Sequence, residues 1–255
     1  MFRHSHSFNR LNRLAAVALL SLAAVAGHAA DPQVSPAISA AVADQGRPQA
    51  DKDKDGGRKP ALSVAFAGIE PGDKVADLLA GQGYFTRIFS KLVGNSGVVY
   101  ATAFPPRPGM PNPSALETLA ADPAYTNVRV LRGALADLKF PQPLDVAWTS
   151  LNYHDIHNAN GQDTLNKTIF AALKPGGTYI VIDHAARPGS GANDAPTLHR
   201  IDPELVKKEV EAVGFKFASE GDFLRNPNDP HTIVSHDPSI RWHTDQFILK
   251  FTKPE

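Results

Sequence analysis

From residue 60 onward, two patterns of hydrophobic and polar positions follow one another along the chain. Short runs rich in β-branched and other apolar residues predict strands, and runs with apolar positions three or four residues apart predict amphipathic helices. Strands are expected over residues 74–79, 97–103, 128–131, 144–151, 178–183, 215–220 and 246–251. Helices are expected over residues 61–68, 84–92, 114–121, 163–173 and 203–213.

This order of elements predicts the layers of the fold. Strands that alternate with helices require right-handed crossovers, which build a mostly parallel sheet with helices on both faces. The last two strands have no amphipathic helix between them, so we expect them to form an antiparallel hairpin. The sequence therefore predicts an α/β fold, a doubly wound, mostly parallel, seven-stranded sheet with a C-terminal antiparallel hairpin.

The first residues of the chain have the pattern of an export signal. Arg3, Arg10 and Arg13 precede an uncharged apolar run over residues 14–26, which is shorter than the roughly twenty residues that span a bilayer. Gly27-His28-Ala29 is typical of the segment before a cleavage site. We therefore expect residues 1–29 to be a signal peptide and the mature protein to be exported to the periplasm, without membrane association after cleavage. An uncleaved membrane anchor is the alternative.

The next segment, residues 30–57, is rich in Ala, Pro, Gln, Asp and Lys, and its apolar periodicity ends at Val42. This composition predicts a short helix at most, followed by a solvated linker. Residues 51–56 match the first positions of a calcium-binding loop, but Leu62 stands where that loop needs a glutamate, so calcium binding is not expected there. We interpret residues 30–57 as a lead-in and residues 58–255 as the folded domain.

Composition narrows the expected function. The chain of 255 residues carries 26 basic and 26 acidic residues, and removal of the three arginines in residues 1–29 would leave 23 basic residues and a net charge of −3. A slightly acidic protein has no long-range positive field to hold a polyanion, so nucleic acid is not expected as a partner. The absence of Cys excludes disulfides, thiolate zinc sites, iron–sulfur clusters and a cysteine nucleophile.

A glycine-containing turn follows the first predicted strand. Asp77 stands near the end of that strand, Gly81 and Gly83 follow, and an amphipathic helix begins at Tyr84. In an open parallel sheet, ligands bind beyond the carboxyl ends of the strands. Glycines let the backbone approach a ligand there, and a carboxylate can hold an amino group or order water. The segment predicts a ligand site, although a tight turn without a ligand has the same pattern.

With this segment, the sequence resembles the class I S-adenosylmethionine-dependent methyltransferases. The resemblance covers nearly all of residues 60–255, including the terminal hairpin and Leu173-Lys174-Pro175-Gly176-Gly177 before the fifth strand. A narrower resemblance, to a bacterial group of exported predicted methyltransferases, rests on Arg58-Lys59-Pro60, Asn152-Tyr153-His154-Asp155 and His199-Arg200-Ile201-Asp202. The resemblance implies a Rossmann-like fold, S-adenosylmethionine as cofactor and a small-molecule substrate. It implies that the cofactor is bound by Asp77, Leu79, Gly81, Gly83 and Asn152.

Three positions depart from the pattern of that family. Leu79 stands where the glycine motif usually has Gly, and Ala103 stands where the second strand normally ends in an acid that binds both ribose hydroxyls. An Asp that receives the adenine amino group is expected near Gly133, whereas the nearest is Asp137. The missing ribose carboxylate costs about 2 kcal/mol, or roughly thirtyfold in affinity. We therefore expect weaker or differently arranged cofactor binding.

Histidines follow the fourth and fifth predicted strands. His154 and Asp155 come after the fourth strand, where the methyltransferases place a group that faces the transferred methyl, and His184 ends the fifth. Imidazole, with an unperturbed pKa of about 6.5, can take a proton from a hydroxyl or an amine. We predict His154 as the base, Asp155 as its partner or a substrate contact, and His184 as a further catalytic residue. His199 is a weaker candidate.

Other functions stay open at this point. The protein could be a methyltransferase-fold protein without the cofactor, acting as a periplasmic binding protein or as a metal-dependent enzyme. In the latter, zinc or iron would be bound by His154, Asp155, His184 and His199. A nicotinamide-dependent oxidoreductase is disfavoured because Thr86 replaces the third glycine of its motif. The polar segment 226–243 is interpreted as a lid or as a surface loop.

Overall fold

Seven strands form one sheet in the part of the chain that the computed structural model describes, residues 1–2, 31–106, 108–109, 111 and 114–255. The strands lie in the order β3-β2-β1-β4-β5-β7-β6. Neighbours from β3 to β5 are parallel, and β7 is antiparallel to both β5 and β6. This confirms the predicted doubly wound sheet and its terminal hairpin. The strands are β1 Lys74–Leu78, β2 Val98–Ala103, β3 Val128–Arg132, β4 Leu144–Ser150, β5 Leu173–His184, β6 Lys216–Gly221 and β7 Gln246–Thr252.

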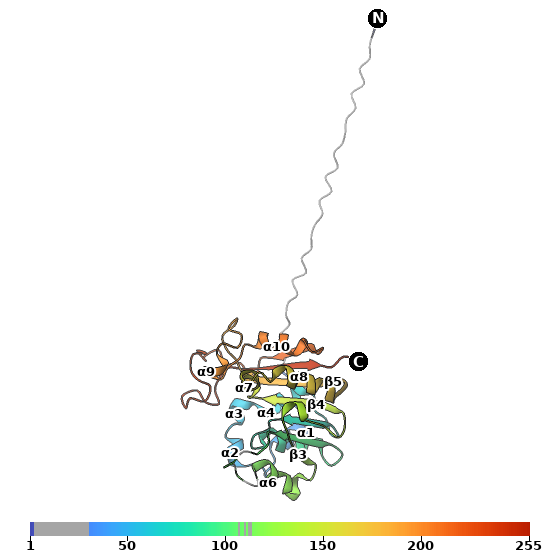
Figure 1. Ribbon diagram of the computed structural model, residues 1–255, viewed down its shortest axis with the longest axis vertical. Coiled ribbons are helices and arrows are strands. Elements are labelled where there is room, and N and C mark those ends of the chain that lie inside the picture. Colours follow the sequence, from blue (N-terminus) through green and yellow to red (C-terminus); the bar gives the residue numbers. More distant parts are fainter. Residues whose placement is uncertain (3–30, 107, 110, 112–113) are drawn as a thin grey trace.

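Helices cover both faces of this sheet (Figure 1). Residues of α1, α4 and α5 share one hydrophobic core with the sheet, and residues of α7, α8 and α10 share the other. The α-helices are α1 Pro36–Val42, α2 Gln49–Lys52, α3 Asp55–Arg58, α4 Pro60–Ala67, α5 Tyr84–Val93, α6 Ala115–Ala121, α7 Tyr153–Asn158, α8 Gln162–Ala172, α9 Ala195–Leu198 and α10 Pro203–Glu211. Two short 3₁₀ helices are η1 Pro123–Tyr125 and η2 Leu135–Asp137.

The two cores follow from the period of two in a strand, which sends successive side chains to opposite faces. In β5, Ile180 and Ile182 pack into the core beside α5, whereas Tyr179 and Val181 pack into the core beside α8. All four are at most 2% exposed. Burial of each such side chain contributes about 1.5–3 kcal/mol, so the central strands hold the sheet rigid under the loops at its carboxyl edge.

Residues 30–57 are not the solvated linker that their composition predicts. The described part of this segment forms α1, α2 and most of α3, and Ile38 and Ala41 of α1 are buried in the same core as α5. The polar residues are paired: the Arg47 guanidinium binds both oxygens of Asp55, at 2.9 and 2.6 Å. Such pairing lets a charged segment pack against a domain, and no local periodicity reveals it.

The start of one strand and the presence of two short helices also differ from what the sequence predicts. β5 begins at Leu173, earlier than the expected 178, because Leu173 pairs with Leu144 of β4 and the chain end pairs with residues 176–177. Gly176 donates to the carbonyl of Lys253, and Lys253 donates to that of Gly177, both at 2.9 Å. The short helices α7 and α9, which carry or border candidate site residues, were not expected from the sequence.

No helix among the described residues is long and apolar enough to cross a membrane. The expected signal peptide, residues 1–29, lies outside the described residues except for its first two positions. Its cleavage therefore stays a prediction.

Candidate active site

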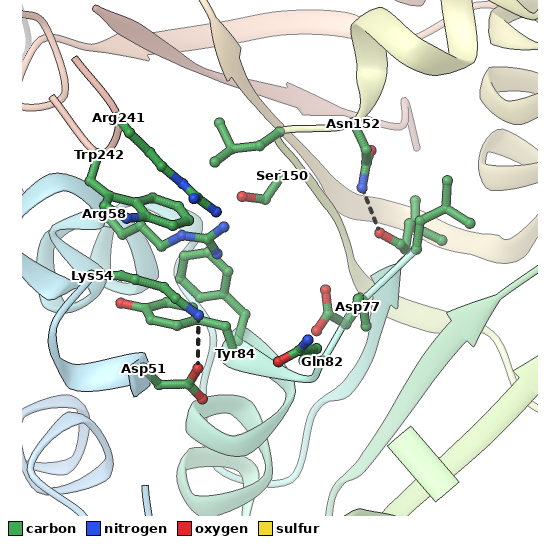
Figure 2. A pocket seen from close by; sticks show the side chains of 16 residues that line it. Asp51, Lys54, Arg58, Asp77, Gln82, Tyr84, Ser150, Asn152, Arg241 and Trp242 are labelled. Carbon is green, nitrogen blue, oxygen red and sulfur yellow. Dashed lines mark hydrogen bonds and ion pairs between the residues drawn. The ribbon is translucent and has the colours of Figure 1, made fainter. Parts of the chain in front are cut away.

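A cavity of about 310 Å³ opens at the carboxyl end of β1. Figure 2 shows Arg58, Arg241 and Trp242 on one side of it and Asp77 and Gln82 on the other. Its remaining walls are Asp51, Lys54, Leu78, Leu79, Ala80, Gly81, Tyr84, Phe85, Ser150, Leu151 and Asn152. Four of the five residues expected to bind a cofactor therefore line one cavity.

The turn after β1 has a glycine-type backbone at three of its positions. Leu79, Gly81 and Gly83 have φ of 49°, 59° and 83°, in the left-handed region that disfavours side chains. A Cβ added to Gly81 would meet no atom of the described residues within 4 Å, so the backbone faces open space in this part of the structure. Gly83 is different: it begins α5, and a Cβ would meet the Leu119 side chain at 2.8 Å. Gly83 thus shapes the turn without lining the cavity.

Asp77 and Asp51 are buried acids of the cavity, and Asp51 is already paired with Lys54 and Arg87. The Asp77 side chain accepts a hydrogen bond of 2.6 Å from the Thr86 hydroxyl, and the residue is 4% exposed. Burial disfavours the charged form and raises the pKa of Asp77 to about 7, even though Thr86 and the Arg58 charge oppose this. The carboxyl group is consequently ready to gain or lose a proton near neutral pH when a cation approaches.

Arg58, like Arg241, is a cation of the cavity without a carboxylate partner among the described contacts. The Arg58 guanidinium lies 4.5 Å from the ring centre of Tyr84 and 5.7 Å from that of Trp242. The Arg58 Nε atom is buried without a hydrogen-bond partner, and burial lowers the pKa of the side chain. A half-buried guanidinium without a partner is a ready site for a carboxylate or another anion.

Two segments far apart in the sequence bring these residues together. The N-terminal segment supplies Lys54 and Arg58, and the C-terminal segment supplies Arg241 and Trp242. They touch at Gly57, where a Cβ would lie 1.9 Å from the Trp242 carbonyl oxygen. The C-terminal segment is pinned by a fully buried ion pair in which Arg200 contacts Asp229 at 2.8 Å. It forms a wall of the cavity, so the description as a plain surface loop does not fit it.

A second cavity, of about 350 Å³, lies beside the first at the end of β2. It shares Leu79 and Gly81 with the first cavity and is otherwise lined by Ala103, Phe104, Pro105, Ser114, Leu116 and Arg132. None of these described lining residues is acidic. Arg132 is already bound, because its guanidinium contacts Glu117 at 2.8 Å and Ser114 at 2.6 Å. The ribose carboxylate that Ala103 replaces is therefore not supplied by another of these residues.

Asn152 connects this cavity to the predicted catalytic residues. Its amide donates to the carbonyl of Leu78 at 3.1 Å, and its oxygen accepts from the Thr149 hydroxyl. The residue immediately precedes α7, whose first turn carries His154 and Asp155. The end of β1 and the start of α7 are thus held together by a single side chain.

His154 is buried at the start of α7, where a second buried group orients it. Its Nδ1 lies 2.8 Å from Oδ1 of Asp183, which has no exposed side-chain surface. Burial alone would raise the pKa of Asp183 and lower that of His154, but their mutual attraction outweighs it, so the pKa of Asp183 is lowered and that of His154 is raised. The carboxylate fixes the proton on Nδ1 and leaves Nε2 as the free nitrogen of the neutral ring.

Two of the candidate residues lie close to Nε2 of His154, and a third does not. Nε2 of His154 lies 3.3 Å from Nδ1 of His199 and 3.5 Å from Oδ1 of Asp155. His184 does not join them: its Nδ1 is bonded to the Thr244 hydroxyl at 2.8 Å. Burial lowers the pKa of His184 to about 4, so this side chain is neutral at physiological pH.

Sequence reasoning missed three residues that shape the site. Asp183 carries a detectable signal, because it is a lone acid at the end of a strongly apolar run. Arg58 and Trp242 carry only weak signals, since one lies in a polar segment and the other in a loop, and tertiary packing alone aims them at the cavity.

Comparisons with known proteins agree with this fold. No protein-family model matches the sequence. The chain is 28% identical over 194 residues to the ubiquinone/menaquinone biosynthesis C-methyltransferase of Neisseria meningitidis serogroup C, over 74% of this chain and 68% of the relative. A S-adenosylmethionine-dependent methyltransferase from Aquifex aeolicus superposes with a TM-score of 0.53 at 18% identity, covering 82% of this chain and 99% of that one. The cyclase SpnF superposes with a TM-score of 0.55 at 18% identity, covering 83% and 85%. At these identities the solved structures show a shared fold.

Proposed function

We propose that this chain, which belongs by fold and sequence similarity to the class I S-adenosylmethionine-dependent methyltransferases, transfers a methyl group from S-adenosylmethionine to a small molecule. The observation that carries the proposal is the open backbone at Gly81, which lies on the boundary of both cavities. A cofactor with an amino-acid end and a nucleoside end needs two adjoining compartments of this kind.

The first cavity fits the amino-acid end. Arg58 offers an unpartnered guanidinium for the carboxylate, and its buried Nε has an unsatisfied donor. Asp77 offers a carboxylate for the ammonium group, and a bound cation would favour its ionised form. The second cavity fits the nucleoside less well, because its described walls are mostly apolar and lack an acid for the ribose. We therefore propose a modest affinity for the cofactor.

His154 is proposed as the residue that acts on the acceptor. Bound S-adenosylmethionine supplies an electrophilic methyl group on a sulfonium sulfur. Nε2 of His154 can take the proton of a hydroxyl or amine acceptor, because Asp183 holds the other ring nitrogen in its protonated form. Asp155, which is 58% exposed at its side chain, can contact the acceptor from the solvent side.

Calorimetric titration of residues 30–255 with S-adenosylmethionine tests the proposal. We expect saturable binding of one equivalent, and no heat at millimolar cofactor would overturn the proposal. Gly81→Ala should weaken binding, since it puts a methyl group on the cavity boundary. Gly191→Ala is the matched control: its φ of 58° is close to the 59° of Gly81, and its Cβ would also meet nothing within 4 Å.

Export is a separate proposal that rests on residues 1–29. The charged start, the short apolar run and Gly27-His28-Ala29 support cleavage after Ala29. We expect the mature protein in the periplasmic fraction, with an N-terminus at Ala30 by mass spectrometry. Full-length protein recovered with the membranes would contradict it. Periplasmic activity would also require a supply of S-adenosylmethionine outside the cytoplasm.

A cofactor-free binding protein is the second candidate. Leu79 at the glycine position and Ala103 at the acid position favour it, because both weaken the cofactor site. The calorimetric titration separates the two candidates directly, since only the first predicts binding that Gly81→Ala impairs and Gly191→Ala does not.

A further inference from the structure

Three metal-ligating atoms converge at the carboxyl edge of β4 and β5. Nε2 of His154, Nδ1 of His199 and Oδ1 of Asp155 are separated by 3.3, 3.5 and 3.4 Å. All are longer than the usual 2.7–3.2 Å of a hydrogen bond to nitrogen or oxygen. In a tetrahedron with metal–ligand bonds of about 2.0–2.1 Å, however, the ligands lie about 3.3–3.4 Å apart.

We propose that His154, Asp155 and His199 form a binding site for a divalent transition-metal ion, with zinc as the best fit. Two imidazoles and one carboxylate are ligands of zinc and its neighbours in the transition series, whereas magnesium and calcium prefer sets made of oxygen alone. The metal site uses Nε2 of His154 and the carboxylate of Asp155, the groups that the proposed methyl transfer assigns to the acceptor, so a bound metal ion would take the place of His154 as a base. None of the three ligands lines the cavity at Gly81, so metal binding can be tested without the cofactor.

The surroundings of His154 have the form of an outer coordination shell. Zinc-binding histidines usually donate their other ring nitrogen to a carboxylate, which fixes the tautomer and the ring direction. Asp183 provides this carboxylate at 2.8 Å from Nδ1, and it also accepts the backbone N–H groups of His154 and His184 at 2.8 Å each. The Nε2 lone pair is thereby directed at the other two ligands.

His199 has a strained backbone conformation, and the buried residue that follows it, Arg200, holds it in place. The His199 φ of 53° is in the left-handed region, which is costly for a residue with a side chain and is often found at functional sites. The next residue, Arg200, is fully buried in its ion pair with Asp229. This anchoring sets the direction of the imidazole toward His154.

The site is open to solvent on one side. The side chains of His199 and Asp155 keep 36% and 58% of their surface exposed, so water or a substrate can reach a fourth position. Three protein ligands with one open position are typical of catalytic zinc, whereas structural zinc has four. His184 is outside the group, because Thr244 binds its Nδ1.

The test uses residues 30–255 after treatment with a chelator, with no S-adenosylmethionine present. Zinc is titrated by calorimetry, and cobalt(II) is titrated by visible absorption, where a tetrahedral site absorbs strongly. We expect the unaltered protein to bind one equivalent of each metal. His199→Ala and Asp155→Asn should each lose at least tenfold in affinity, because the loss of a group in the outer coordination shell alone typically costs tenfold or more. Both ligands are partly exposed, so these variants should fold where His154→Ala could fail.

Matched controls are His243→Ala and Asp163→Asn, which change exposed residues outside the cluster and should bind metal like the unaltered protein. Zinc should also raise the melting temperature of the unaltered protein and not that of His199→Ala. Two results would overturn the proposal: no stoichiometric binding of zinc or cobalt, or stoichiometric binding that His199→Ala and Asp155→Asn leave unchanged.

Discussion

The backbone N–H of Leu79 donates to the hydroxyl of Thr102 at 2.9 Å. In addition, the N–H of Ala80 donates to the Thr102 carbonyl at 3.0 Å. These two bonds hold the turn after β1 against β2 and keep Leu79 at a φ of 49°. The backbone has thus kept the conformation that a glycine would adopt freely, although the side chain is leucine.

Leu79→Gly and Leu79→Ala should therefore differ in stability. Both lose the packing of a partly buried leucine, but only glycine relieves the left-handed strain, which costs about 1–2 kcal/mol. We expect the free energy of unfolding of Leu79→Gly, measured by urea denaturation, to be about 1 kcal/mol higher than that of Leu79→Ala. Equal stability of the two variants would show that the turn carries no strain.

Arg58→Met should weaken the binding of S-adenosylmethionine about tenfold to a hundredfold, because a charged hydrogen bond contributes about 1.5–3 kcal/mol. The variant should bind the decarboxylated cofactor as well as the unaltered protein does, since that ligand has no carboxylate for Arg58. Arg129→Met, which changes an exposed arginine away from both cavities, is the control. An equal loss for both ligands would argue against a carboxylate contact.

Ala103→Asp should restore the acid at the end of β2. If the nucleoside occupies the second cavity, the new carboxylate can bind the ribose hydroxyls and tighten cofactor binding roughly thirtyfold. Ala103→Asn, of similar size and without charge, should give a smaller gain. An unchanged dissociation constant in Ala103→Asp would place the ribose elsewhere.

Asp77 should make folding stability fall as pH rises. Its pKa is raised from the ordinary 3.8 to about 7, so between these values the folded chain binds more protons than the unfolded chain. A pKa difference of this size corresponds to about 4 kcal/mol. In urea unfolding, Asp77→Asn should gain stability over the unaltered protein from about pH 4 upward and level off above about pH 7.

The control for Asp77→Asn is Asp163→Asn, because the Asp163 side chain is 62% exposed and pairs with Lys167 across one helical turn. Its stability should follow that of the unaltered protein at each pH. A stability difference for Asp77→Asn that stays flat or shrinks with rising pH would contradict the assigned burial effect.

The strands of the sheet could be predicted from sequence because their signal is local. The run that became the centre of β5 is apolar and β-branched, and it is buried on both faces. The turn at Gly81 was likewise predictable from the order of strand, acid, glycine and helix. Register and pairing at the chain end were not, because Gly176 meets Lys253 only in the folded sheet.

Much of the site depends on contacts between segments that are distant in sequence. His154, Asp155 and His199 were each identified as candidates, but their convergence depends on the paths of α7 and α9. Arg58 enters the cavity because a segment with the composition of a linker folds against α5, through a hydrogen bond of 2.5 Å from Tyr84 to Asp55. Single-sequence patterns carry no information on such pairs.

If a cofactor lies across the Gly81 turn, a crystal structure of residues 30–255 grown with S-adenosylhomocysteine should show it. We expect ligand density over Gly81, with the amino-acid end near Arg58 and Asp77 and the nucleoside near Ala103. Density for solvent alone in both cavities, in crystals grown with millimolar ligand, would contradict this placement.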